Sequence, residues 1–187
     1  MKLRRWFVVI GGLLLGCADQ SLIYNVQLSP AYNRTEYGYG AGRRDLTTVI
    51  YGDPFQLGEE PFQAQFIEVL NRHQSILQPT HFTTTPGPSA RPIYRAVFLF
   101  DRAIVTPTRV CTAPESVPPV DLGDTVRVTA GFCRRGGYLS SVTGEVKVSS
   151  LDDPRFGDMI GQMILLLFPP VDPNDDDPRF LITRSGE

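Results

Sequence analysis

Lysine is almost absent from this chain of 187 residues, which has only Lys2 and Lys147 among its 18 basic residues. It has two histidines and three cysteines, and its apolar runs are shorter than the about 20 residues of a membrane-spanning helix. The formal net charge of −2 argues against binding to nucleic acid through a basic face, so we expect no nucleic-acid partner. With 42% hydrophobic and 20% charged residues, the composition excludes a disordered chain and a coiled coil, and predicts one globular domain.

The N-terminus has the pattern of an export signal. Three basic side chains lie in residues 1–5, and residues 6–15 are an unbroken run of apolar residues and glycines, the length of a signal-peptide core. The residues at its end, Leu14-Leu15-Gly16-Cys17, resemble the lipobox of bacterial lipoproteins, although Leu15 is bulkier than usual. The resemblance implies cleavage between Gly16 and Cys17, and acylation of Cys17 at its thiol and at the new amino group. Two or more acyl chains hold a protein stably at a lipid bilayer.

Two other interpretations of this segment stay open. One is an ordinary secretory signal in which the cysteine stands by chance. The other is a twin-arginine export signal, which Arg4-Arg5 resembles, although the usual serine or threonine before the arginines is missing. Removal of residues 1–16 would leave 15 basic and 20 acidic residues, a net charge of −5.

Cys111 and Cys133 are the two cysteines outside the signal. In an oxidising compartment such a pair is expected to form a disulfide, here closing a loop of about 22 residues. The alternatives are a metal-binding pair or a nucleophilic cysteine with a spare. Neither cysteine has a CxxC partner, and two histidines do not complete a recognisable site. We therefore expect no metal site and no cofactor.

The chain after the signal is divided by composition into three parts. Residues 17–44 are rich in Tyr, Asn, Gly and Ser without helical or strand periodicity, which predicts a lipidated flexible tether reaching roughly 30 Å. Its tyrosines leave a second interpretation open, contact with a partner or a glycan. Residues 45–170 predict the globular domain, and residues 171–187 predict an acidic tail. Part of the tail is similar to a calcium-binding loop, but Asp177 and Thr183 replace the required glycine and glutamate.

Six elements are predicted within the domain from hydrophobic periodicity and turn residues. The expected strands are residues 46–51, 93–100, 125–132 and 138–148, and the expected helices are residues 59 to about 77 and 153–168. The order β-α-β-β-β-α predicts an α+β fold: a single two-layer sandwich with a mixed sheet of about four strands and two helices on one face. The first helix would cross over between parallel strands, and the last two strands would form a hairpin.

The candidate sites in this domain are weak. The loop between the first helix and the second strand contains hydroxyls, a glycine and an arginine that could hold an anion, although two prolines remove amide donors. Its candidate ligand-binding residues are Thr83, Thr84, Thr85, Ser89 and Arg91. A structured connector without ligand is the more common meaning of such a loop. His73, and Arg134 with Arg135, are expected to be a boundary histidine and a solvated hairpin tip.

Two functions from different classes fit these features. The first is a non-catalytic envelope lipoprotein, a binding or assembly module held at the bilayer by Cys17 and contacting an envelope protein. The second is a periplasmic hydrolase with a hydroxyl nucleophile, but no catalytic residues can be named because neither histidine lies near a nucleophile in a recognisable pattern. Ala18 follows the cysteine where aspartate would favour retention at the inner membrane, although Asp19 weakens that argument. We expect an outer-membrane lipoprotein that faces the periplasm.

Overall fold

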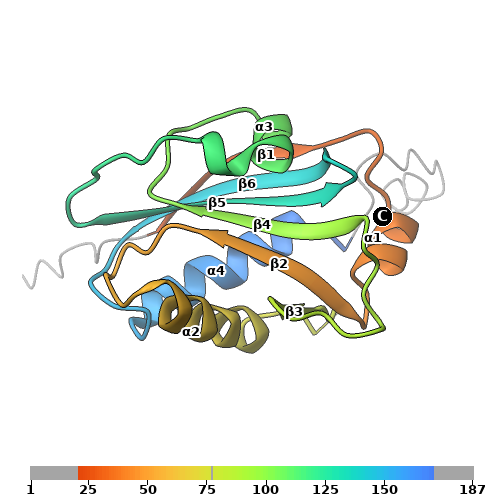
Figure 1. Ribbon diagram of the computed structural model, residues 1–187, viewed down its shortest axis with the longest axis horizontal. Coiled ribbons are helices and arrows are strands. Elements are labelled where there is room, and N and C mark those ends of the chain that lie inside the picture. Colours follow the sequence, from red (N-terminus) through yellow and green to blue (C-terminus); the bar gives the residue numbers. More distant parts are fainter. Residues whose placement is uncertain (1–20, 77, 171–187) are drawn as a thin grey trace, which may run out of the picture.

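The computed structural model describes residues 21–76 and 78–170 as a mixed six-stranded sheet with helices on both faces (Figure 1). The strands are β1 (Leu22–Leu28), β2 (Asp45–Tyr51), β3 (His81–Thr83), β4 (Tyr94–Phe100), β5 (Thr125–Arg134) and β6 (Gly137–Lys147). The helices are α1 (Arg34–Gly40), α2 (Glu59–Arg72), α3 (Pro107–Thr112) and α4 (Pro154–Leu167), with a 3-10 turn at Pro114–Ser116.

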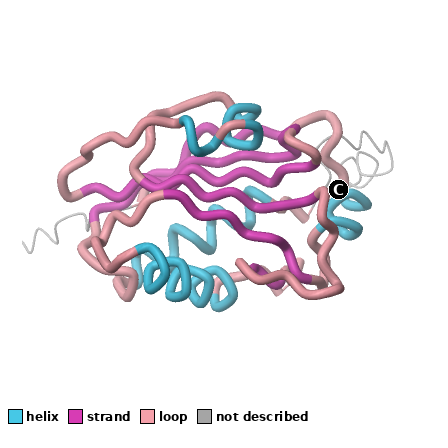
Figure 2. The backbone as a smooth tube through the Cα atoms, in the orientation of Figure 1, coloured by secondary structure: helices cyan, strands magenta, loops and turns pink. Residues whose placement is uncertain are grey.

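The strands lie in the order β1-β6-β5-β4-β2-β3 (Figure 2). β2 pairs in parallel with β3 and β4, whereas β4, β5, β6 and β1 pair antiparallel. The parallel pairing of β2 with β4 confirms the predicted crossover through α2, and the pairing of β5 with β6 confirms the predicted hairpin. The class is therefore α+β, as expected, but the sheet has six strands rather than about four, and the described chain has four α-helices rather than two.

The larger core lies between the sheet and the two long helices, which Figure 1 shows below it. Helix α2 begins with Glu59 and Glu60 in its first turn, where acidic side chains suit the helix dipole, and Asp153 caps α4 by accepting a bond from the Arg155 amide. The expected apolar stripes of both helices are buried, namely Phe62, Phe66, Val69 and Leu70 of α2 and Phe156, Ile160, Met163, Ile164 and Leu167 of α4. These stripes bind both helices to the same face of the sheet.

The opposite face of the sheet is covered by α3, which the sequence did not indicate. Val97 and Leu99 of β4 point to this side and pack with Val110, Cys111, Val117 and Cys133. Because β4 is apolar on both faces, water must be excluded from each of them. The expectation of helices on one face alone was therefore wrong, since α3 is too short to have shown a periodic stripe.

The segment expected to be a flexible tether is folded from residue 21 onward. β1 pairs with β6 from Leu22 opposite Glu145 to Leu28 opposite Ser140, with an irregular register between Tyr24 and Gln27. Helix α1 follows, capped by Asn33, whose side chain accepts a bond from the Glu36 amide at 2.8 Å. Two tyrosines of this segment, Tyr32 and Tyr37, are buried in the core. The prediction of a tether over residues 17–44 was therefore wrong for its described part.

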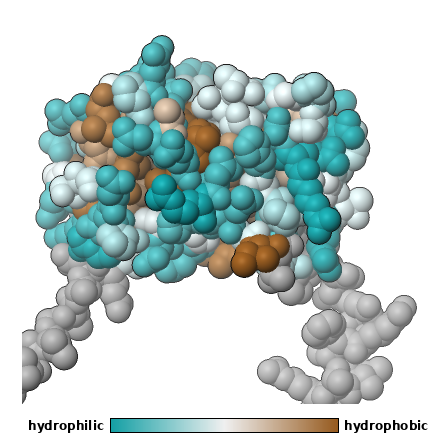
Figure 3. Space-filling view, turned by 90° about the horizontal axis from the view of Figure 1, so that it is seen from below, coloured by the Kyte–Doolittle hydropathy of each residue, from teal (hydrophilic) through white to brown (hydrophobic). Residues whose placement is uncertain are grey.

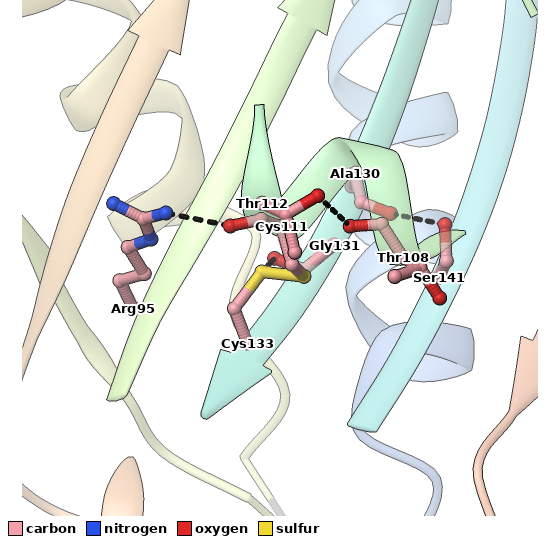
Figure 4. Close-up of a disulfide and its surroundings, with 8 residues drawn as sticks. All are labelled: Arg95, Thr108, Cys111, Thr112, Ala130, Gly131, Cys133 and Ser141. Atoms are coloured by element: carbon pink, nitrogen blue, oxygen red, sulfur yellow. Dashed lines mark hydrogen bonds between the residues drawn. A yellow bond between two sulfur atoms is a disulfide. The ribbon is translucent and has the colours of Figure 1, made fainter. Parts of the chain in front are cut away.

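The disulfide between Cys111 and Cys133 is present and joins α3 to β5 across a Cα–Cα distance of 5.6 Å (Figure 4). Arg95 of β4 donates to the Cys111 carbonyl at 2.6 Å, so α3 is bound to the sheet by a covalent bond and a charged hydrogen bond. A side chain at Gly131 would lie 2.9 Å from Val110 Cγ1, which is too close. Glycine at this position lets α3 lie directly on β5.

We predict that Cys111→Ser or Cys133→Ser lowers the free energy of unfolding by about 2–4 kcal/mol, because the open loop gains conformational entropy in the unfolded chain. Urea unfolding measures the change. A reducing agent should destabilise the unaltered protein to a similar extent and leave the double variant Cys111→Ser, Cys133→Ser unchanged. This comparison separates the loss of the bond from the loss of packing. Two free thiols in protein isolated from an oxidising compartment would contradict the prediction.

Candidate functional site

The candidate ligand-binding loop, residues 83–91, connects β3 to β4 beside the start of β2. Asp45, the first residue of β2, organises this loop: its Oδ2 accepts a hydrogen bond from the Gly87 amide at 2.7 Å, and its own amide donates to Ser89 Oγ at 3.0 Å. Its Oδ1 lies 2.8 Å from His81 Nδ1. The anion held by this loop is therefore a carboxylate of the chain itself.

The other residues proposed for this loop do not converge on one point. The Thr85 amide donates to Thr83 Oγ1 at 3.1 Å, a local turn, and Thr84 is exposed. Arg91 lies with its guanidinium carbon 4.7 Å from the centre of the Tyr39 ring, a cation–π contact to α1. The connector interpretation therefore fits residues 83–89, while the Arg91 side chain contacts α1.

The ionisation of Asp45 is set by these contacts. The hydrogen bond with His81, followed by the bond from the Gly87 amide, holds the pKa of the Asp45 carboxyl below its usual range. Both contacts stabilise the ionised carboxylate. The loop is thus fastened by a charge that persists at neutral pH.

A hollow of about 390 Å³ opens next to this carboxylate. Its walls include Arg43, Arg44, Asp45, Thr80, His81 and Ser89. Arg43 has a left-handed backbone (φ 54°), its amide donates to the Pro79 carbonyl at 2.8 Å, and its side chain is exposed. Both arginines lie within residues 17–44, which were expected to be a tether, so no local pattern marked them as part of a site. Pairing of β2 with β3 and β4 brings them beside the loop.

The other residues considered from the sequence, His73, Arg134 and Arg135, lie outside this hollow. His73 follows the last residue of α2 and packs closely on α4. A side chain added at Gly157 of α4 would lie only 2.5 Å from His73 Nε2. Arg134 forms an ion pair with Glu36 at 2.7 Å, and Arg135 is exposed at the hairpin tip with φ 51°. His81 is bonded to a carboxylate, but within residues 21–76 and 78–170 neither histidine is hydrogen-bonded to a hydroxyl group.

A second hollow, of about 540 Å³, lies at the opposite end of the sheet. Asp101, Lys147 and Arg155 are among its lining residues. Burial raises the pKa of the Asp101 carboxyl above its usual value, while the Arg127 amide, which donates to it at 2.8 Å, acts in the other direction. No group of three or more His, Cys, Asp or Glu residues placed to hold a metal ion occurs in the described part of the chain. Likewise, none of the described helices is long and apolar enough to cross a membrane.

Comparison with known proteins adds little. No protein-family description and no curated protein matches the chain. Among solved structures, a PelC dodecamer from Paraburkholderia phytofirmans and a single-residue variant of it are similar, each with a TM-score of 0.43 and 11% sequence identity. The similarity covers 80% of this chain and 98–99% of the PelC chains. At this level the likeness carries no argument about function.

We predict that Asp45→Asn loosens the loop and removes part of the acid sensitivity of the protein. A carboxyl whose folded pKa is lowered stabilises the fold above its unfolded pKa of about 3.9, and this stability is lost as the pH falls through the folded value. The unaltered protein should therefore lose stability more steeply below about pH 4 than Asp45→Asn does. At neutral pH, hydrogen exchange of the Gly87 amide should be faster in the variant.

Asp53→Asn is the matched control for this experiment. Asp53 also accepts two amide hydrogen bonds, from Phe55 and Gly58, but in the loop between β2 and α2. It should leave the exchange of the Gly87 amide unchanged. An equal effect of both variants on Gly87 would show that Asp45 does not hold the loop.

Proposed function

We propose that this protein is a non-catalytic binding or assembly module of a bacterial envelope, anchored to a lipid bilayer through acylated Cys17. The observation that carries the proposal is the sequence Leu14-Leu15-Gly16-Cys17 at the end of an apolar run of signal-peptide length. The Cys111–Cys133 disulfide supports it, because such bonds persist in oxidising compartments and are rare in the cytosol. No observation favours the hydrolase.

The structure changes how such an anchor would hold the domain. Cys17 precedes Leu22, the first residue of β1, by only five positions. At about 3.3–3.6 Å per residue this length of chain spans at most ~18 Å, compared with the roughly 30 Å of the expected tether. The end of the sheet at which β1 begins would therefore lie next to the bilayer, with the domain attached directly rather than on a long spacer.

We name this the anchor end and define it by the start of β1, the ends of β2, β4 and β6, and the starts of α2 and α4. Its exposed side chains include the apolar residues Leu22 and Leu57. Figure 3, which views the helical layer, shows apolar colour toward this side, at the left of the picture, and a second apolar patch at the lower edge, right of centre. Eight acidic side chains lie in its loops and first helical turns: Asp53, Glu59, Glu60, Asp101, Asp121, Asp124, Asp152 and Asp153. Three basic residues accompany them, Arg102, Lys147 and Arg155.

The acidic character of this end makes the acyl chains the decisive attachment. An anionic bilayer surface attracts basic segments and gives no second binding signal to a surface rich in carboxylates. We therefore predict that Cys17→Ser leaves the protein unprocessed or moves it from the membrane into the soluble envelope fraction. Membrane fractionation with immunoblotting measures this. Correctly cleaved Cys17→Ser protein that stays with the membranes would refute the anchor.

We further propose the outer membrane, facing the periplasm, as the location, since Ala18 occupies the position where aspartate favours inner-membrane retention. In a sucrose gradient the mature protein should sediment with outer-membrane markers. Ala18→Asp is the informative variant, because it should shift the protein toward inner-membrane markers without changing the folded domain. Cofractionation of the unaltered protein with inner-membrane markers would overturn this location and leave the lipid anchor intact.

A further inference from the structure

Several arginines lie together at the end of the sheet opposite the anchor end. We name this the arginine end and define it by α1, the starts of β2 and β4, the loop of residues 83–91 and the β5–β6 hairpin tip (right in Figure 1). Its arginines are Arg34, Arg43, Arg44, Arg91, Arg134 and Arg135. Its acidic residues are Glu36 and Asp45. We propose that the arginine end binds a polyanion, a linear chain carrying repeated phosphate or carboxylate groups.

The charge of this end is not neutralised inside the domain. Glu36 is engaged by Arg134 at 2.7 Å and by the Tyr94 hydroxyl at 2.7 Å, and Asp45 is engaged by His81 and the loop. Within residues 21–76 and 78–170, no ion pair reaches the other five arginines of this end. The Arg91 Nε also has no hydrogen-bond partner in that part of the chain, although it is buried. Five guanidinium groups of this end therefore carry a positive charge that no ion pair of the described residues neutralises.

A series of contacts connects four of these six arginines. From the hairpin tip, Arg134 contacts Glu36, which accepts a bond from Tyr94, and the Tyr94 ring lies 5.9 Å from that of Tyr39. Arg91 lies over Tyr39, which continues the series toward the hollow.

On the other side of Arg91, Ser89 is bonded to the Asp45 amide, and Asp45 follows Arg43 and Arg44 directly in the chain. Ser89 and both arginines also line the 390 Å³ hollow. A ligand that follows this series of contacts would meet arginines from the hairpin, the loop and the segment before β2. A linear polymer fits such an arrangement better than a compact ligand.

The chemistry of arginine restricts what this polymer carries. The guanidinium group stays charged at any physiological pH and donates two parallel hydrogen bonds to a carboxylate or a phosphate. The hollow beside Arg43 and Arg44 is open and has room for one such group. Several positive charges on one surface also raise the local concentration of an anionic chain and its rate of association.

The orientation of the arginine end relative to the bilayer rests on the proposed function, whereas the ligand proposed for it does not. If Cys17 is lipidated, the strands place the arginine end on the far side of the domain from the bilayer. β5 and β6, with 10 and 11 residues, separate the two ends by about 30 Å at ~3.3 Å per residue. The polymer would then be met in the periplasm and not in the headgroups of the anchoring leaflet.

The test uses the chain from residue 17 to residue 187 with Cys17→Ser, so that its outcome does not depend on the anchor. Binding to fluorescent polyphosphate and to polyglutamate is measured by anisotropy at low and at physiological salt. We expect binding to at least one polymer, weakened by salt because exposed charges are screened. The polymer bound more tightly identifies phosphate or carboxylate as the preferred group. Absence of binding to both polymers at low salt would overturn the proposal.

Two double variants locate the binding surface. Arg43→Gln with Arg44→Gln should weaken binding roughly 4- to 25-fold, since each exposed ion pair changes affinity by about two- to fivefold. Arg109→Gln with Lys147→Gln removes the same charge from α3 and the end of β6, where Arg109 and Lys147 are exposed, and should change affinity less than about twofold. Thermal unfolding of both variants checks that they are folded. Equal effects of the two pairs would overturn the proposal.

A last comparison concerns the acidic residues 171–187, which follow Pro170. A chain that ends at Pro170 should bind the polymers as the longer chain does, or more tightly because five acidic and only two basic residues have been removed. Binding seen only after this removal would overturn the proposal and make the chain's own acidic segment the occupant of the arginine end.

Discussion

The two apolar faces of β4 are the constraint on which the architecture depends. Phe98 and Phe100 point to the face covered by α2 and α4, while Val97 and Leu99 point to the other. A sheet with such a central strand must be covered twice, but the described chain has only two long amphipathic helices, and both lie on one face. The second face is covered by α3, a helix of six residues, and the disulfide to β5 together with Arg95 holds it there.

Helices and strands with a periodic pattern of buried residues could be predicted from the sequence. Elements that depend on contacts with residues far away in the sequence could not. The stripes of α2 and α4 and the alternation in β5 predicted these elements correctly. β1 has no alternation of buried and exposed residues, and a bulge interrupts its pairing. α1 contains glycines that look like a spacer, yet a side chain at Gly40 would lie 2.4 Å from the Tyr94 ring. Close packing explains this glycine, and no local pattern could reveal it.

The candidate site likewise depends on contacts between residues far apart in the sequence. The hydroxyls and glycine of residues 83–91 suggested that an anion is bound there, and a carboxylate is bound, that of Asp45. Asp45 is about 40 positions away in the sequence, so the loop alone could not show that its donors were already engaged. Arg43 and Arg44 come directly before Asp45 and were assigned to the tether. Pairing of β2 with β3 and β4 places all three beside the loop.

Net charge is a sum over the whole chain and does not show where the charges lie. In this protein the positive and negative charges gather at opposite ends of the sheet. A value of −2 for the chain excludes a wholly basic protein, but six arginines and two acidic residues lie at one end of the sheet, and eight acidic and three basic residues lie at the other. The topology produces this separation, because β2 and β4 begin at the arginine end and α2 and α4 begin at the anchor end. The acidic first turn of α2 and the Asp153 cap of α4 therefore fall at the same end as the start of β1. With so short a chain from Cys17 to β1, a lipid anchor would turn the acidic end toward the bilayer and the arginines away from it.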